Sequence, residues 1–188
     1  KIKCTFKGKK AHAGIEPEKG INAIVVASDA ISNMHIGRID ELTTSNIGRI
    51  EGGGATNIVT DSVTFTAEIR SHIADKLQEI AHMENCCREA AQKFKAEYEF
   101  IHENCYPPFS LDLNSDLYKL TEKAMLKEGI TPESIVIGGG SDANILAALG
   151  YKSAILSMGM YEPHAVTEYL KIDEMMQTLK VVRNMMDI

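Results

Sequence analysis

The chain is 188 residues long, enough for one large domain or two small ones with a hydrophobic core. Its 20 basic and 26 acidic residues give a formal net charge of −6, which speaks against a nucleic-acid or membrane-surface role. No apolar run approaches the roughly 20 residues that span a bilayer. The 4 cysteines form no Cys-x-x-Cys pair, so we expect buried free thiols in a reducing cytoplasm.

Residues 1–105 carry alternating strand and helix patterns. Side chains of alternating polarity predict four strands, at residues 1–7, 45–50, 62–71 and 97–102. Apolar residues at helical spacing predict a helix over residues 20–34, and a capping box of Asp75 with Gln78 predicts the start of a second helix. The order β-α-β-β-α-β is that of a ferredoxin-like α+β domain, in which two helices cover one face of a four-stranded antiparallel sheet.

Tyr106-Pro107-Pro108-Phe109 breaks this pattern and marks a domain boundary, so residues 106–188 form a second part. Apolar periodicity there predicts a helix that ends at Gly129 and a last helix over residues 172–186, with Met175, Met176, Leu179 and Val182 facing inward. Apolar runs predict two parallel strands, at residues 135–137 and 153–157, with a helix between them. Because two parallel strands do not form a stable sheet alone, we expect other strands to complete this α/β part.

Polar residues follow both of these strands. The first strand ends at Gly138-Gly139-Gly140 and is followed by Ser141 and Asp142, while His164 and Glu168 come after the second strand. Ligands in open α/β sheets bind beyond the carboxyl ends of the strands, so these residues are expected to converge. For His164 the choice is between a metal ligand and a solvated loop residue. Glu168 either orients the histidine ring or is a helix charge, and Asp142 is an alternative helix N-cap.

Two further patterns leave alternatives open. Residues 138–143 fit the G-x-G-x-x-A dinucleotide fingerprint, with Glu162 as the nearest acidic partner. In the first half, His12 lies between two alanines, Asn57 lies in a glycine-rich loop, and Arg70 ends the polar face of a strand, where it can bind a carboxylate. Taken singly, each of these three residues is also consistent with surface decoration.

Six segments together resemble the carboxy-terminal part of M20 metallopeptidases, and they are most similar to the peptidase T-like branch. They run in family order over nearly the whole chain: Lys10-Ala11-His12-Ala13-Gly14 with Gly20-Ile21-Asn22-Ala23, Gly52-Gly53-Gly54-Ala55-Thr56-Asn57-Ile58-Val59-Thr60-Asp61, Glu68-Ile69-Arg70-Ser71, Gly138-Gly139-Gly140-Ser141-Asp142-Ala143-Asn144 and His164-Ala165-Val166-Thr167-Glu168-Tyr169.

The resemblance implies that residues 1–105 are a lid and dimerisation domain, and that residues 106–188 are the last part of a discontinuous zinc-exopeptidase-type catalytic domain. It implies two zinc or other divalent ions, a small peptide substrate and a homodimer that forms through the lid. It further implies that His164 is a metal ligand and that His12 is a catalytic residue acting at the partner subunit's site. Substrate-binding roles follow for Asn57, Arg70, Gly139, Gly140 and Ser141.

The family's earlier motifs, which supply the general base and most metal ligands, are absent, since the sequence contains no Glu-Glu pair and no His-x-Asp. We therefore expect an inactive fragment of a zinc-dependent di- or tripeptidase. The alternatives are a non-catalytic dimerisation module and a small-molecule or dinucleotide-binding α/β domain.

Overall fold

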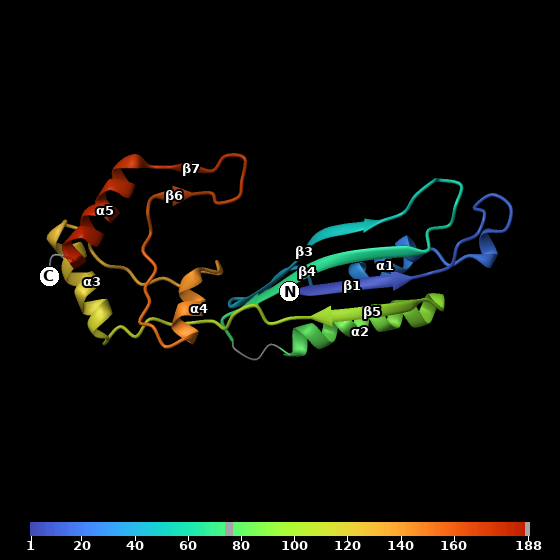
Figure 1. Cartoon of the computed structure of the whole chain (residues 1–188), viewed down its shortest axis with the longest axis horizontal. Helices are drawn as coiled ribbons and strands as arrows, with labels where there is room; N and C mark the ends of the chain where they lie inside the picture. The colour runs from blue at the N-terminus through green and yellow to red at the C-terminus, as the bar shows by residue number, and fades with distance from the viewer. Residues whose placement is uncertain (74–76, 187–188) are drawn as a thin grey trace. The chain divides into compact units, whose positions relative to one another are not determined.

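The computed structural model describes residues 1–73 and 77–186 (Figure 1). The chain divides into two compact units, which we call unit 1, Lys1–Pro108, and unit 2, Phe109–Ile188. The predicted capping box of Asp75 with Gln78 involves a residue outside the described ranges.

Unit 1 is built on an antiparallel sheet with the strand order β2-β3-β4-β1-β5. Its strands are β1 (Ile2–Lys7), β2 (Gly37–Asp40), β3 (Thr43–Gly52), β4 (Ser62–Ser71) and β5 (Glu97–His102). The mixed α/β fold class is confirmed, and β1, β3, β4 and β5 form where alternation predicts strands. The prediction of four strands is wrong, because β2 adds a short edge strand beside the start of β3.

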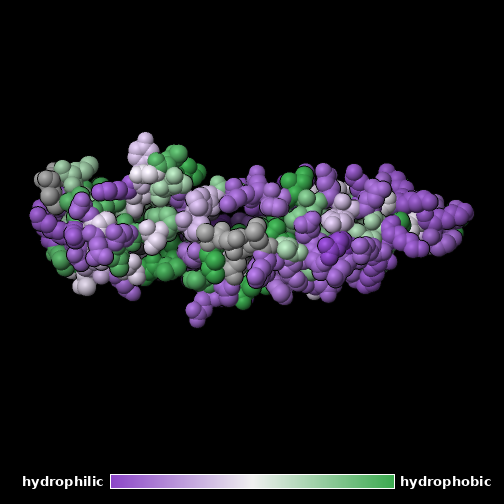
Figure 2. Space-filling view, turned by 90° about the horizontal axis from the view of Figure 1, so that it is seen from below, coloured by the Kyte–Doolittle hydropathy of each residue, from purple (hydrophilic) through white to green (hydrophobic). Residues whose placement is uncertain are grey.

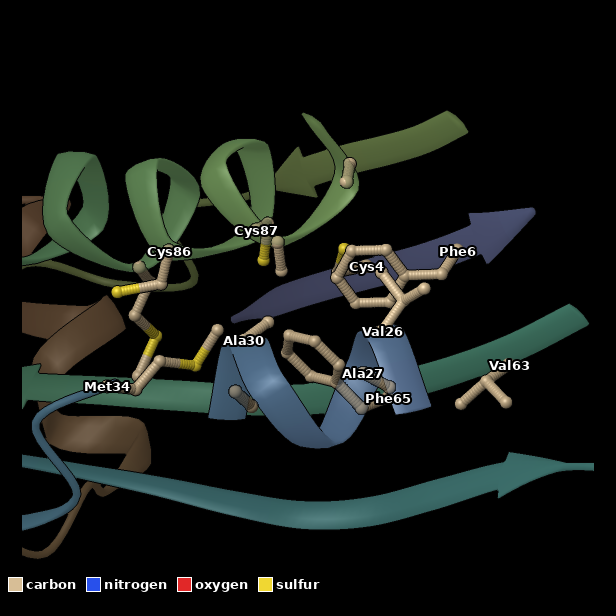
Figure 3. Packing of buried hydrophobic residues seen from close by; sticks show 14 of the residues in the cluster. Cys4, Phe6, Val26, Ala27, Ala30, Met34, Val63, Phe65, Cys86 and Cys87 are labelled. Carbon is tan, nitrogen blue, oxygen red and sulfur yellow. The ribbon is translucent and has the colours of Figure 1, made fainter. Parts of the chain in front are cut away.

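Helices α1 (Ala23–Ser32) and α2 (Leu77–Phe94) share one core with the inward face of this sheet. Side chains from β1, β4, α1 and α2 point into the same space (Figure 3). Phe6 and Phe65 are fully buried there, with ring centroids 6.3 Å apart. Asn22 caps α1 by accepting a hydrogen bond from the Ile24 backbone N–H at 3.0 Å. Unit 1 thus has a hydrophobic core of its own.

We predict that Phe65→Ala lowers the free energy of unfolding of unit 1 by about 3–5 kcal/mol, because it leaves a cavity in this core. Ile15→Ala is the matched control, since Ile15 is 71% exposed and its loss leaves no cavity. Urea unfolding monitored by circular dichroism measures both variants. Equal midpoints for the two would contradict the burial of Phe65.

The thiols agree in part with the sequence prediction. All four cysteines are free, and Cys4, Cys86 and Cys87 are buried, whereas the expected burial is wrong for Cys105, which is exposed. A hydrogen bond with Cys4, together with burial, raises the pKa of Cys87, so this thiol stays neutral. None of the helices in the described ranges combines the length and apolarity needed to cross a membrane.

Unit 2 contains α3 (Asp116–Lys127), α4 (Asp142–Ala148), α5 (Ile172–Met186) and a hairpin of β6 (Met160–Tyr161) with β7 (Tyr169–Leu170). The predicted strands at residues 135–137 and 153–157 are wrong for this structure, because neither segment pairs with another among the described residues. Ile135 and Val136 are 67% and 72% exposed. An apolar run becomes a strand only when neighbouring strands accept its backbone hydrogen bonds.

The predicted inward face of α5 is also wrong in part. Val181 and Asn184 are the buried residues of this helix, whereas Met176, Leu179 and Val182 are exposed. The buried side faces α3, where the Asn184 side-chain amide donates to Glu128 at 2.7 Å. Hydrophobic patches remain on the surface of unit 2 (Figure 2), where the described residues of this unit leave apolar side chains exposed.

Candidate active site

The structure brings the His12 and Asn57 segments together at one end of the sheet of unit 1. His12 pairs with Ile58 in an antiparallel bridge, and the Ala13 N–H donates to the Asn57 carbonyl at 2.9 Å. A side chain at Gly20 would come within 2.9 Å of the Val59 side chain, so the close approach of these loops requires glycine there. Both His12 and Asn57 are exposed and lie at the surface of the loop pair.

A backbone hydrogen bond sets the tautomer of His12. The Gly14 N–H donates to Nδ1 of the imidazole at 3.2 Å, so Nδ1 carries a lone pair. A neutral imidazole has one N–H, which must then be on Nε2. The exposed ring therefore presents an N–H donor to any group that approaches it. The sequence pattern identifies His12, but it does not identify Gly14 as the residue that orients it.

A shallow hollow of about 440 Å³ adjoins the Asn57 loop. Its lining includes Lys10, Gly53, Ile58 and Thr64. Lys10 lies 3.4 Å from a carboxylate oxygen of Asp61, so the rim of the hollow carries charges of both signs.

Arg70 lies far from His12 and Asn57 in unit 1. Arg70 lies eight residues after Ser62 on β4, a distance of about 26 Å at the usual rise of a strand. Its Nε donates to Glu68 at 2.8 Å and its Nη2 donates to the second carboxylate oxygen at 3.3 Å. These hydrogen bonds raise the pKa of Arg70, which stays charged. A substrate carboxylate would have to share or displace Glu68.

The glycine segment of unit 2 ends in a helix cap. Ser141 is the N-cap of α4: its Oγ accepts from the Ala143 N–H at 3.3 Å, and its N–H donates to the Asn144 side chain at 3.0 Å. The alternative of Asp142 as N-cap is therefore wrong. Gly139 is exposed, with open space around it. Since no strand precedes the glycines, the βαβ unit that a dinucleotide fingerprint requires is missing from the described residues.

His164 lies in the turn between β6 and β7, with its side chain exposed. Its φ of 68° is in the left-handed region, which non-glycine residues rarely adopt. The Glu168 carboxylate accepts a hydrogen bond from the His164 backbone N–H. Glu168 thus contacts the backbone of His164, whereas the two alternatives from the sequence are an orienting contact with the imidazole ring and a helix charge. Glu168 precedes α5, so it is not a charge of that helix.

His164 fits one position of a metal site, because its imidazole is exposed on a turn whose backbone is held in place. Among residues 1–73 and 77–186, no group of three His, Cys, Asp or Glu side chains is arranged to hold a metal ion. The described residues therefore do not supply three ligands at this point. Any further ligands would have to come from residues beyond the described ones.

Comparisons with known proteins identify the family of the chain. The family described as "peptidase dimerisation domain" matches residues 1–100. YqjE of Bacillus subtilis is 42% identical over 183 residues, which are 97% of this chain and 49% of that protein. The chain spans about half the length of the relatives that it matches.

Two solved structures share the fold of nearly the whole chain. Aminopeptidase PepT from Bacillus cereus superposes with a TM-score of 0.82 at 37% identity, over 98% of this chain and 50% of that one. A tripeptidase from Staphylococcus aureus has a TM-score of 0.87 at 34% identity, over 98% and 49%. The resemblance to the peptidase T-like branch is confirmed. Because the dimerisation-domain match extends over more than half of the 188 residues, the chain belongs to the M20 peptidase family.

Proposed function

We propose that the complete protein is a metal-dependent peptidase that cleaves short peptides, and that unit 1 is its lid and dimerisation domain. Unit 2 is then the last part of a catalytic domain whose other strands and helices lie outside these 188 residues. The observation that carries this proposal is the fold shared with two solved peptidases over 98% of the chain. A cytoplasmic location is part of the proposal, supported by the free thiols.

The metal centre takes His164 from this chain. Two zinc ions, or two other divalent metal ions, would act as Lewis acids that activate the peptide carbonyl and a water molecule. The remaining ligands and the general base come from the other half of the catalytic domain. The segments at residues 135–137 and 153–157 support this division, because they are apolar and lack strand partners among the described residues.

His12 donates its Nε2–H to the substrate carbonyl oxygen and to the negative charge that develops there. The hydrogen bond from Gly14 supports this role, because it keeps the donor on the outer nitrogen of the ring. Asn57 lies beside His12 and offers an amide to the substrate backbone. Arg70 is too far from His12 to reach the same short peptide, so it holds the carboxylate of a substrate in the other site of the dimer. Gly139, Gly140 and Ser141 line the cleft.

His12 acts at the site of a partner subunit. β5 ends at His102, which pairs with Ile2, so the chain leaves the sheet at the end where β1 begins. His12 lies beyond Lys7 at the other end of β1, a separation of at least about 17 Å of extended strand. The catalytic histidine is thus on the end of the lid away from its own connection to unit 2, which favours action on another subunit.

The lid pairs with a second copy through β3 and α1. β2 pairs with β3 only up to Ser45, which leaves the edge of residues 46–52 without a strand neighbour in the described chain. Ile50 of β3 pairs with Phe65 of β4, so both side chains lie on the face of the sheet that the helices cover. Ile50 is nevertheless 51% exposed, because α1 packs over β4 and β1 more than over β3. Ile24 and Val25 of α1 are 43% and 46% exposed. A two-fold contact would cover this edge and these apolar side chains together.

Zinc binding by the complete protein tests the proposal. The wild-type protein, stripped of metal, is expected to bind zinc tightly and to cleave di- or tripeptides when reloaded. His164→Ala is expected to weaken zinc binding by more than about tenfold and to abolish peptidase activity. His102→Ala is the matched control, because it removes an exposed histidine from unit 1. Full zinc affinity in His164→Ala would contradict the ligand assignment, and a dimer without peptidase activity would favour the non-catalytic alternative.

A further inference from the structure

The hairpin that carries His164 is held at its base by three side chains, Tyr161, Lys171 and Glu174, which we call the hairpin clamp. The Tyr161 hydroxyl lies 2.8 and 3.0 Å from the two carboxylate oxygens of Glu174. The Lys171 ammonium donates to Glu174 at 3.0 Å and to the Tyr161 oxygen at 3.2 Å. Each side chain of the clamp therefore contacts the other two.

Charge and ring contacts reinforce this network. Lys171 Nζ lies 4.4 Å from the centre of the Tyr161 ring, in the geometry of a cation–π contact. The hydrogen bond between Lys171 and Glu174 raises the pKa of Lys171 and lowers that of Glu174. Both groups are thus charged at neutral pH. The Tyr169 ring stacks on Tyr161 at 5.0 Å between centroids, with the planes 8° apart.

The backbone brings the hairpin against the start of α5. The Lys171 N–H donates to the Gly159 carbonyl at 2.9 Å. Gly159 has a φ of 78°, and a Cβ there would lie 2.7 Å from Cβ of Glu174, so only glycine permits this approach. One helical turn further along, the Thr178 hydroxyl donates to the Ser157 carbonyl at 2.7 Å. The chain leading into the hairpin is therefore attached to α5 at two levels.

The tip of the hairpin is held separately from its base. Glu168 accepts from the His164 N–H, and the Thr167 hydroxyl donates to the Glu162 carboxylate. These contacts fix the shape of the turn, but they do not fix its direction relative to the rest of unit 2. Only two residue pairs join β6 to β7, too short a ladder to be rigid alone. The clamp supplies the missing connection between the turn and α5.

We propose that Tyr161, Lys171 and Glu174 are positioning residues that aim the His164 imidazole at the metal centre. This inference rests on the proposed function, because it takes His164 as a metal ligand. The side chains of Lys171 and Glu174 are 49% and 38% exposed, so their ion pair adds little to global stability. The loss of the clamp therefore reorients His164 and leaves unit 2 folded.

Zinc affinity of the complete protein, measured by competition with a chromophoric chelator, tests this role together with the thermal midpoint of unfolding. Tyr161→Phe and Glu174→Gln are expected to weaken zinc binding by about tenfold each, as the loss of residues that orient metal ligands does. Tyr169→Phe and Asp173→Asn are matched controls, because they remove a neighbouring tyrosine hydroxyl on the same hairpin and a neighbouring carboxylate charge on α5. Glu174→Asp keeps the carboxylate and is expected to restore part of the affinity.

The outcomes separate the inference from the function on which it rests. Weaker zinc binding in both clamp variants, with an unchanged midpoint and normal controls, supports the clamp. Wild-type affinity in the clamp variants, while His164→Ala loses zinc, overturns the clamp and leaves the peptidase proposal standing. Affinity that falls only together with the thermal midpoint also overturns it, because the three residues would then be structural. Wild-type affinity in His164→Ala overturns the ligand assignment itself.

Discussion

His12→Ala in the complete protein is expected to lower kcat by about 100- to 1,000-fold while KM changes by less than about threefold. The Nε2–H donor acts on charge that develops in the transition state, so its loss affects the chemical step more than substrate binding. His12 is exposed and lies outside the core, so the variant should fold normally. Steady-state kinetics on a tripeptide measure both constants.

Two control variants show whether a loss of turnover in His12→Ala is specific to this histidine. His72→Ala removes another exposed histidine of unit 1 and is expected to leave kcat unchanged. His12→Gln retains an N–H donor and is expected to recover part of the lost turnover. An unchanged kcat in His12→Ala would contradict the catalytic role, and a large rise in KM alone would assign His12 to substrate binding.

Mixing two inactive variants tests whether His12 acts across the dimer. In a hybrid of His12→Ala with His164→Ala, one site receives an intact His12 from one subunit and an intact His164 from the other. Random exchange makes half of the dimers hybrids, with one complete site in two, so about a quarter of wild-type activity should return. If His12 served its own subunit, no hybrid would have a complete site and the mixture would stay inactive.

The sequence predicts unit 1 well because its strands are half-buried. β4 and β5 begin and end where the alternation of side chains predicts, since one face of each strand meets the core and the other faces away from it. β2 is missed because Gly37–Asp40 has a single apolar residue, Ile39, and no alternation. Its pairing depends on the register of β3, which a four-residue pattern does not encode.

Unit 2 is predicted less well because an apolar run indicates burial and does not identify what buries it. Residues 135–137 and 153–157 have strand-like sequences, yet their backbone groups have no ladder partners among the described residues. The same holds for α5, whose stripe of Met176 and Leu179 is exposed, while Val181 and Asn184 meet α3. In both cases the apolar surface exceeds what unit 2 alone can cover.

The candidate site is also predicted only in part from the sequence. Motifs identify His12, Asn57 and His164, but the bridge that joins His12 to Ile58 connects residues far apart in sequence. No local pattern encodes that contact or the hydrogen bond from Gly14 that sets the tautomer. The pairing of Arg70 with Glu68 was open to prediction, since residues two apart on a strand share a face.

Ile50→Lys is expected to convert the complete protein from a dimer to a monomer, with a dimer dissociation constant raised by about 100-fold or more. A lysine at this position would place a charge against the edge of residues 46–52 and the apolar side of α1, where the partner's Ile50 would also lie. Ile101→Lys is a closely matched control. Ile101 is 53% exposed against 51% for Ile50, and it lies on β5, the opposite edge of the sheet.

Light scattering and peptidase activity, measured over the same range of protein concentration, join this prediction to the role of His12. If His12 completes the partner's site, turnover by Ile50→Lys should fall as the dimer dissociates and return as concentration restores it. Ile101→Lys should remain dimeric and active throughout. A fully active Ile50→Lys monomer would contradict catalysis across the dimer, whereas a stable Ile50→Lys dimer would move the interface away from β3. The opposite pattern, with Ile101→Lys as the monomer, would assign dimerisation to β5 and leave the edge of β3 to another partner.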